Sequence, residues 1–247
     1  MTRKTISLLL NKLLPVDKED RNSAPREAWL AKTLAAIPAG SRILDAGAGE
    51  LSKKKYCAHL SYVSQDFGQY EGDGDGKGLQ TGKWDQSRLD IVCDITTIPE
   101  PDASFDAVLC VEVFEHLPNP LLALDELVRL LRPGGHLVLT APFCAFTHFA
   151  PFFFNTGFSE YWYRQHLESR GMDILELIPN GNFPAYLAQE VGRIPDIALR
   201  YAGVTPTYVE RIGLRVVNSL LWRMHQADRA SQEFVCFGWQ VLARKRK

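Results

Sequence analysis

The sequence predicts an α/β fold in which helices cover both faces of a doubly wound, mostly parallel sheet. Apolar segments of strand length alternate with helical segments of about 10–15 residues, which is typical of parallel sheets. The segment 105–111 is nearly all apolar, as expected for a strand that is covered on both faces. The 247 residues are enough for one large core. In such a fold, ligands bind at the carboxyl ends of the strands.

Seven segments have the character of strands, and three have helical periodicity followed by a stop signal. The predicted strands are 42–46, 60–66, 90–93, 105–111, 136–141, 172–178 and 234–243. The predicted helices are 25–37, which ends at Pro38-Ala39-Gly40, 120–131, which ends at the break Pro133-Gly134-Gly135, and 159–170, which ends at Gly171.

Two segments do not fit this alternation. Residues 71–83 form a glycine-rich insertion, which we interpret as a flexible flap over the ligand. Residues 184–230 carry helical patterns before the last strand, and we interpret them as a cap or as the surface of a homodimer. With helices in residues 1–40, the prediction is a single domain over residues 1–247.

The composition disfavours several classes of protein. A net charge of −1 argues against a protein that binds nucleic acid by charge alone. No apolar run of about 18 residues occurs, so no transmembrane segment is predicted. Five scattered cysteines without zinc-binding spacing favour a reduced, cytoplasmic protein. The N-terminus from Arg3 to Lys12 is expected to form a short amphipathic helix, with a membrane-surface role as the alternative.

A carboxylate and two glycines lie where the first predicted strand ends. Glycines such as Gly47 and Gly49 let the backbone turn tightly and let a ligand approach closely beside Asp45. The helix N-terminus expected next favours negative groups such as a carboxylate. A dinucleotide fingerprint requires a third glycine where this chain has Ser52, so a pyrophosphate site is disfavoured.

Acidic residues also end the second and third predicted strands. The Asp66 carboxylate can accept hydrogen bonds from both hydroxyls of a ribose. Asp94 is followed by Ile95, and an acceptor beside an apolar surface suits the amine and the face of an adenine. Such features at three successive strand ends indicate a nucleoside-containing ligand.

Four motifs between residues 43 and 142 resemble class I S-adenosylmethionine-dependent methyltransferases. They are Asp45-Ala-Gly-Ala-Gly49, Cys93-Asp-Ile-Thr-Thr-Ile-Pro99, the segment from Phe105-Asp-Ala-Val to Glu115-His-Leu117, and Leu130-Leu-Arg-Pro-Gly-Gly135. The chain is similar to the small-molecule subgroup typified by ubiquinone-biosynthesis enzymes. The resemblance implies a Rossmann-like fold of seven strands, whose last strand is antiparallel and lies between strands five and six.

The resemblance also implies that the cofactor is S-adenosyl-L-methionine. The residues expected to bind it are Asp45, Ala46, Gly47, Gly49, Asp66, Asp94, Ile95, Val111 and Glu112. By this resemblance, Asp66 holds the ribose hydroxyls, and Asp94 and Ile95 contact the adenine.

An aromatic cluster follows the fifth predicted strand. Of the 26 aromatic residues, ten lie between 143 and 163, and the first part of this stretch has no regular period. We interpret it as a loop that forms a substrate pocket or lid, with packing as the alternative. The candidate substrate residues are Phe143, His148, Phe149, Phe153, Tyr161 and Trp162.

The function predicted on this basis is methyl transfer to a small-molecule acceptor, with oxygen as the acceptor atom and a sugar or polyketide-like compound as one option. Positioning accounts for most of the catalysis of such a displacement. A general base would be His148 or His116.

Two alternatives remain open. The first is a methyltransferase that acts on RNA or protein, supported by the basic residues 244–247, although such a tail usually forms a solvated end. The second is a donor-binding partner subunit without catalysis. No metal site is predicted, because the glycine-rich insertion has Trp84 where a calcium loop needs a glutamate.

Overall fold

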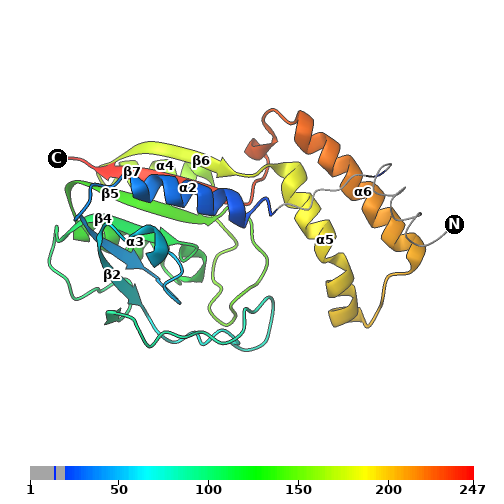
Figure 1. The fold of residues 1–247 in the computed structure, drawn as a ribbon, viewed down its shortest axis with the longest axis horizontal. Coiled ribbons are helices and arrows are strands. Elements are labelled where there is room, and N and C mark those ends of the chain that lie inside the picture. Colours follow the sequence, from blue (N-terminus) through cyan, green and yellow to red (C-terminus); the bar gives the residue numbers. More distant parts are fainter. Residues whose placement is uncertain (1–13, 15–19) are drawn as a thin grey trace. The chain divides into compact units, whose positions relative to one another are not determined.

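The computed structural model describes Leu14 and residues 20–247, so the helix expected between Arg3 and Lys12 lies outside the described residues. The described chain divides into two compact units (Figure 1). The larger unit contains Arg26–Asn180 and Gly238–Lys247, and the other contains Gly181–Phe237 with the described residues before Arg26. The segment 184–230, which the sequence analysis treated as an insertion within one domain, therefore belongs to a unit of its own.

The larger unit is built on a seven-stranded sheet of order β3-β2-β1-β4-β5-β7-β6. The strands are β1 (Arg42–Ala46), β2 (Ser61–Asp66), β3 (Ile91–Val92), β4 (Phe105–Val111), β5 (Leu131–Pro142), β6 (Met172–Asn180) and β7 (Gly238–Lys245). The pairs among β1 to β5 are parallel, whereas β7 is antiparallel to both β5 and β6. The predicted doubly wound sheet, with its last strand between the fifth and the sixth, is confirmed.

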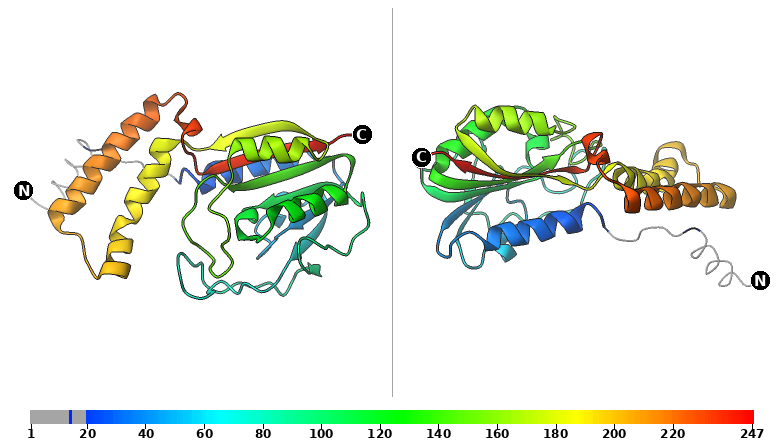
Figure 2. Two further views of the ribbon diagram at one scale, coloured as in Figure 1. Left: turned by 180° about the vertical axis from the view of Figure 1, so that it is seen from behind. Right: turned by 90° about the horizontal axis from the view of Figure 1, so that it is seen from above.

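Helices lie on both faces of this sheet (Figure 2). They are α2 (Ser23–Ala35) on one face, and α3 (Pro120–Leu130) and α4 (Glu160–Glu168) on the other, with short 3₁₀ helices η1 (Lys54–Tyr56) and η2 (Phe114–His116). Leu30 and Leu34 of α2 are fully buried in a cluster with Ile43 and Leu109 of the sheet. Burial of such side chains contributes about 1.5–3 kcal/mol each, so the apolar stripe of α2 fixes this helix on the sheet.

The start of β5 differs from the prediction. The strand begins at Leu131, directly after α3, and not after the turn formed by residues 133–135. The chain stays within the sheet because the register with β4 shifts between Phe105 and Ala107. Gly134 adopts a φ of +83°, which glycine reaches without a Cβ clash. The turn residues thus form an irregularity within the strand.

The last strand also differs from the prediction. β7 begins at Gly238 and not at residue 234, and it includes two residues of the basic C-terminus. The Nζ of Lys245 donates hydrogen bonds to the carbonyls of Val128 (2.7 Å) and Leu131 (2.8 Å) at the end of α3. Arg246 pairs with Asp173 at 2.8 Å. Lys245 is therefore held by the fold, whereas Arg244, Arg246 and Lys247 are exposed, as expected for a solvated basic end.

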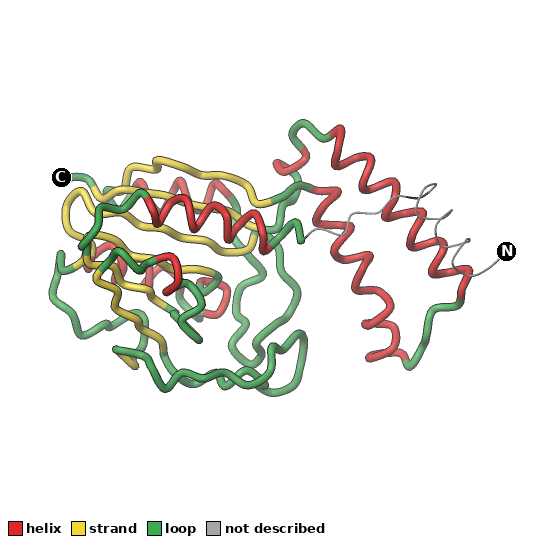
Figure 3. The backbone as a smooth tube through the Cα atoms, in the orientation of Figure 1, coloured by secondary structure: helices red, strands yellow, loops and turns green. Residues whose placement is uncertain are grey.

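The smaller unit is dominated by a pair of helices that lie side by side (Figure 3). They are α5 (Phe183–Ala202) and α6 (Tyr208–Ala227), and the 3₁₀ helix η3 (Ser231–Glu233) follows. Asn182 caps α5, Gly203 ends it in the left-handed conformation, and Thr207 with Glu210 forms a capping box for α6. None of the helices in the described part of the chain is long and apolar enough to cross a membrane.

Candidate functional site

The parallel strands bring the predicted site residues to one edge of the sheet. Residues paired across β1, β2 and β4 lie in register, so Ala46, Asp66 and Val111 end neighbouring strands. The strand order reverses between β1 and β4, which is the position where open α/β sheets bind ligands.

The turn after β1 has a backbone that only glycine fits. Gly47 has a φ of +78°, and an added Cβ would overlap Cγ2 of Val113 and lie 3.0 Å from its Cγ1. Gly49 has a φ of +51°, and its added Cβ would lie 3.1 Å from the ring of Trp84. At both positions an added Cβ would meet a side chain of this chain, whereas the close approach of a ligand expected from sequence stays a prediction.

Asp66 organises the neighbouring strand end. Its side chain is buried, and its Oδ2 accepts a hydrogen bond from the backbone N–H of Gly49 at 2.9 Å. The other oxygen accepts bonds from the N–H of Gly68 (3.0 Å) and the amide of Gln86 (3.2 Å). A ribose hydroxyl can replace the Gln86 amide as a donor to the same oxygen, so the residues present fit the predicted role of Asp66.

Asp45 provides a buried carboxylate in the same region. It accepts a hydrogen bond from the hydroxyl of Tyr62 at 2.6 Å. Burial raises its pKa from 3.8 to about 6, although Tyr62 and Lys53 act in the opposite direction. A cationic ligand near this carboxylate would compensate for its lost hydration, and S-adenosylmethionine carries both an ammonium and a sulfonium.

The two residues expected to contact the adenine, Asp94 and Ile95, differ in their exposure to solvent. Asp94 is exposed, and its Oδ1 accepts bonds from the N–H (2.8 Å) and the hydroxyl (2.7 Å) of Thr96 in a local turn. Ile95 is buried, with 6% of its surface exposed. Asp94 thus keeps an acceptor at the surface while Ile95 packs inward.

Glu112 follows β4 in a strained conformation. Its φ is +53°, which costs a residue with a Cβ about 1–2 kcal/mol. The carboxylate is held by Arg26 (3.1 Å) and by the hydroxyl of Thr140 (2.9 Å). Its N–H also donates to the carbonyl of Thr140, so Glu112 and Val111 before it are fixed against β5. Such strain is concentrated at functional sites.

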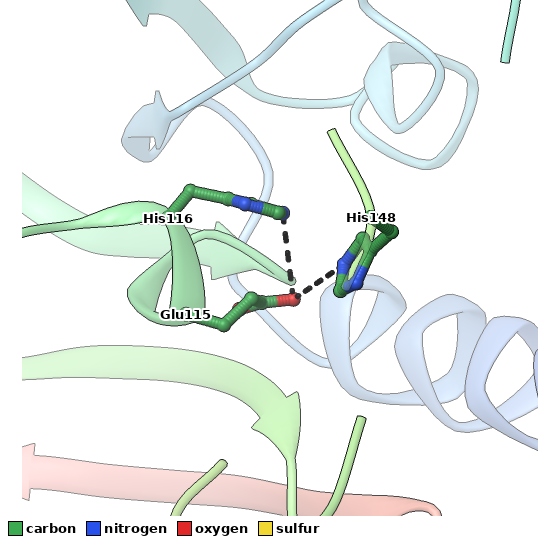
Figure 4. A group of neighbouring side chains, drawn as sticks. All are labelled: Glu115, His116 and His148. Atoms are coloured by element: carbon green, nitrogen blue, oxygen red, sulfur yellow. Dashed lines mark ion pairs between the residues drawn. The ribbon is translucent and has the colours of Figure 1, made fainter. Parts of the chain in front are cut away.

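The two predicted catalytic histidines lie beside each other and share a buried carboxylate (Figure 4). The rings of His116 and His148 are 4.8 Å apart, and each Nε2 lies 3.7 Å from Oε1 of Glu115. Glu115 is 1% exposed. Burial lowers the pKa of His116. Burial acts in the same direction on His148, but Glu115 and the carbonyl of Phe146 outweigh it and raise the His148 pKa.

Aromatic rings surround this pair. The ring of Phe149 stacks on His116 at 5.1 Å, and Phe153 lies 5.0 Å from His148. Phe149 also contacts Trp84 at 5.4 Å, the ring that lies against Gly49. Three of the six candidate substrate residues, His148, Phe149 and Phe153, therefore meet here, and Trp84 connects them to the glycine turn.

The other three candidates lie elsewhere. Trp162 packs against Phe114 and Phe158, which places it in a second aromatic cluster at the start of α4. Tyr161 is 73% exposed. Phe143 is partly buried, and its backbone carbonyl packs closely against Gly157. A Cβ added to Gly157 would overlap that carbonyl oxygen.

The glycine-rich insertion contacts the aromatic loop through backbone hydrogen bonds. The N–H of Leu79 donates to Thr147, and the N–H of Phe149 donates back to Leu79, both at 3.0 Å. Leu79 and His148 thereby form an isolated parallel bridge. This pairing differs from the flexible flap expected from sequence, because it fixes the backbone on both sides of His148.

Glu115 was not predicted from sequence as a site residue. The same is true of Tyr70 and Trp84, whose rings contact Phe149, and of Phe152, whose ring contacts Tyr70. Glu115 carried a signal, because it lies three residues after Glu112 and directly before His116. The rings carried none, because only the contact between the insertion and the aromatic loop brings them together.

Comparisons with known proteins place this arrangement in a family. A methyltransferase-domain family matches residues 44–139. Demethylmenaquinone methyltransferase of Renibacterium salmoninarum is 30% identical over 199 residues, which cover 78% of this chain and 76% of the relative. The chain belongs to the class I S-adenosylmethionine-dependent methyltransferases.

Two further comparisons agree with this family. Ubiquinone biosynthesis O-methyltransferase of Xylella fastidiosa is 36% identical over 63 residues, which are 26% of this chain and 25% of that protein. A crystal structure described as a sarcosine dimethylglycine methyltransferase of Galdieria sulphuraria superposes with a TM-score of 0.55 at 16% identity. That comparison covers 90% of this chain and 86% of the other, and it shows the shared fold. As a member of this family, the methyltransferase uses S-adenosylmethionine as its cofactor.

Proposed function

We propose that this methyltransferase transfers a methyl group to an oxygen atom of a small, ring-containing acceptor of quinol type. The observation that carries the proposal is the arrangement of Trp84 and Phe149, which join the glycine turn to the histidine pair. A flat apolar ring can stack on such side chains. The names of the relatives, which refer to demethylmenaquinone and ubiquinone biosynthesis, support an acceptor of this class.

In this proposal, one set of residues binds the methyl donor and another binds the acceptor. Asp66 and Asp45, with the backbone at Gly47 and Gly49, would hold the donor, and Asp94, Ile95, Val111 and Glu112 would complete its site. When bound, S-adenosylmethionine supplies a methyl group on a positively charged sulfur, which keeps the bonding electron pair when the methyl leaves. The surrounding rings would orient the acceptor oxygen toward the methyl group, and this positioning accounts for most of the rate.

The acceptor hydroxyl must also lose its proton. The Nδ1 of His148 lies 2.8 Å from the carbonyl of Phe146, which can only accept, so Nδ1 carries a hydrogen. In the neutral ring the lone pair is then on Nε2, the atom that faces Glu115. The same argument applies to His116, whose Nδ1 lies 2.6 Å from the carbonyl of Phe152. Either Nε2 can therefore receive a proton, and the raised pKa of His148 favours that residue as the base.

A screen with labelled donor tests the proposal. Purified protein is incubated with labelled S-adenosylmethionine and panels of hydroxylated quinols, sugars and polyketide-like phenols, and the methylated atom is located by mass spectrometry. We expect O-methylation of a quinol. His148→Ala should lower kcat by about 10²–10⁴-fold without weakening donor binding, whereas Leu122→Ala, at an exposed position of α3, should leave kcat unchanged. C-methylation, or activity only on sugars, would overturn the proposed acceptor.

The alternatives gain less support. Of the basic tail that favoured RNA or protein as a substrate, Lys245 is engaged with the end of α3 and Arg246 forms a surface ion pair with Asp173, which leaves few free charges to bind such a substrate. A homodimer through residues 184–230 stays a proposal. It is supported by exposed large apolar side chains on α5 and α6, namely Leu199, Tyr201, Tyr208, Val209, Val217 and Leu220. Analytical ultracentrifugation of the wild type and of Val209→Glu tests it, and a monomeric wild type would refute it.

A further inference from the structure

The cluster of Glu115, His116 and His148 contains buried side-chain atoms that make no hydrogen bonds. Both carboxylate oxygens of Glu115 are buried and have no hydrogen-bond partner, and the same is true of Nε2 of His116. The 3.7 Å separations between the histidine nitrogens and Oε1 are too long for hydrogen bonds. A buried carboxylate without a hydrogen-bond partner is costly, and a cation bound at this point would offset that cost.

The tautomers direct two lone pairs at the same point. Each Nδ1 is occupied by a backbone carbonyl, that of Phe152 for His116 and that of Phe146 for His148. Each neutral ring therefore has its lone pair on Nε2, and both nitrogens approach one carboxylate oxygen (Figure 4). Metal-binding histidines typically donate their other ring N–H to a carbonyl or carboxylate, which is the pattern seen here.

We propose that Glu115, His116 and His148 bind one divalent cation of the Zn²⁺ class. Their ligand atoms all lie within 4.8 Å of one another. Ligand atoms of a tetrahedral zinc ion are separated by about 3.4 Å at bond lengths of about 2.1 Å, so small side-chain rotations close the site. Two imidazoles and one carboxylate suit zinc and neighbouring transition metals better than Ca²⁺ or Mg²⁺, which prefer sites made of oxygen atoms.

The surrounding loop holds the three ligands in place. The carbonyl of Glu115 accepts hydrogen bonds from the N–H groups of Phe154 (2.9 Å) and Asn155 (3.1 Å) in the aromatic loop. The backbone on both sides of His148 is paired with Leu79 of the insertion. Glu115 and His116 belong to η2, so one rigid turn supplies two ligands and the loop supplies the third. Three protein ligands leave at least one coordination position open.

The open position gives the cation a role that rests on the proposed function. A hydroxyl oxygen of the acceptor would bind there as a neutral ligand, and the positive charge would lower its pKa. The O–H bond then breaks, with its proton passing to solvent water, and the resulting oxyanion forms the new O–CH₃ bond. In this state the Nε2 of His148 binds the cation and is not the base. No metal site was predicted from sequence, because the glycine-rich insertion lacks the glutamate of a calcium loop and because His116 and His148 were considered only as bases or substrate residues.

Metal binding is tested without any acceptor. Tag-free full-length protein is treated with a chelator, dialysed and titrated with Co²⁺, whose visible absorption reports its ligand geometry. We expect one equivalent to bind with an intense band that Zn²⁺ displaces. Glu115→Gln and His148→Gln should weaken binding by more than about 10-fold. The matched control is His166→Gln, because this histidine lies on α4 against Trp162 and outside the cluster.

Each outcome decides the proposal. Wild-type binding equal to that of both cluster variants means adventitious surface binding and overturns the site. If Glu115→Gln fails to fold by circular dichroism, the loop variant His148→Gln alone carries the comparison. A protein that binds Co²⁺ at this cluster but does not methylate oxygen refutes the proposed function and leaves the site intact.

Discussion

The substitution Gly47→Ala tests whether the turn after β1 is shaped for close approach. Two costs add at this position. A left-handed φ of +78° costs a residue with a Cβ about 1–2 kcal/mol. The new Cβ also overlaps Val113, and overpacking of this kind costs about 1–3 kcal/mol. We expect a total loss of about 2–5 kcal/mol, a large fraction of the roughly 5–15 kcal/mol by which proteins of this kind are stable.

The matched control is Gly134→Ala. Gly134 has a similar φ of +83°, but nothing lies within 4 Å of its added Cβ. This variant should therefore lose only the conformational part, about 1–2 kcal/mol. A second substitution, Val113→Ala in the Gly47→Ala background, should recover part of the difference, because it removes the two methyl groups that the new Cβ meets.

Urea denaturation followed by circular dichroism measures the loss of stability, and calorimetric titration with S-adenosylmethionine measures donor affinity. Gly47→Ala should weaken donor binding, because the turn is displaced from Val113, whereas Gly134→Ala should not. Equal losses of stability in the two alanine variants, together with equal donor affinities, would refute the reasoning that the clash with Val113 shapes this turn.

Three further predictions follow from buried or bonded charges. Burial raises the Asp45 pKa from 3.8 to about 6, so the free energy of unfolding of the wild type should fall by up to about 3 kcal/mol as pH rises from about 4 to 6. Urea denaturation at a series of pH values measures this slope, and Asp45→Asn should flatten it. Asp66→Ala should weaken donor binding by about 10–100-fold in calorimetry, with the exposed Asp94→Ala as the milder comparison. Lys245→Met should lower unfolding stability by about 1–3 kcal/mol, because two carbonyls at the end of α3 lose a charged donor, while Lys247→Met should not.

The sheet was predictable because its signals are local. A strand covered on both faces must be apolar, and β4 has the bounds that its apolar run predicts, Phe105–Val111. The start of β5 was not predictable, since Pro133-Gly134-Gly135 stops a helix and also fits an irregular strand. Which of these occurs depends on the partner strand, whose register is a tertiary property.

The placement of Gly47, Gly49 and Asp66 at neighbouring strand ends was predictable for the same reason. Gly47, Gly49 and Asp66 lie within or directly after the strands that position them, so the local sequence contains most of the geometry. The acceptor side was predicted only in part. His116 and His148 were identified separately, but their common partner Glu115 was missed although it directly precedes His116, because only the fold brings the loop residue His148 to it.

The aromatic stretch has two roles that composition could not separate. Its first part is irregular, and backbone hydrogen bonds to Leu79 and Glu115 determine which rings face the histidines. Its second part, with Trp162, is helical and packs against Phe114. Phe149 adopts a φ of +53°, a strained conformation in which its ring stacks on His116. The backbone pairing of Leu79 with residues 147–149 holds this part of the loop in one arrangement, and the proposed acceptor site depends on that pairing.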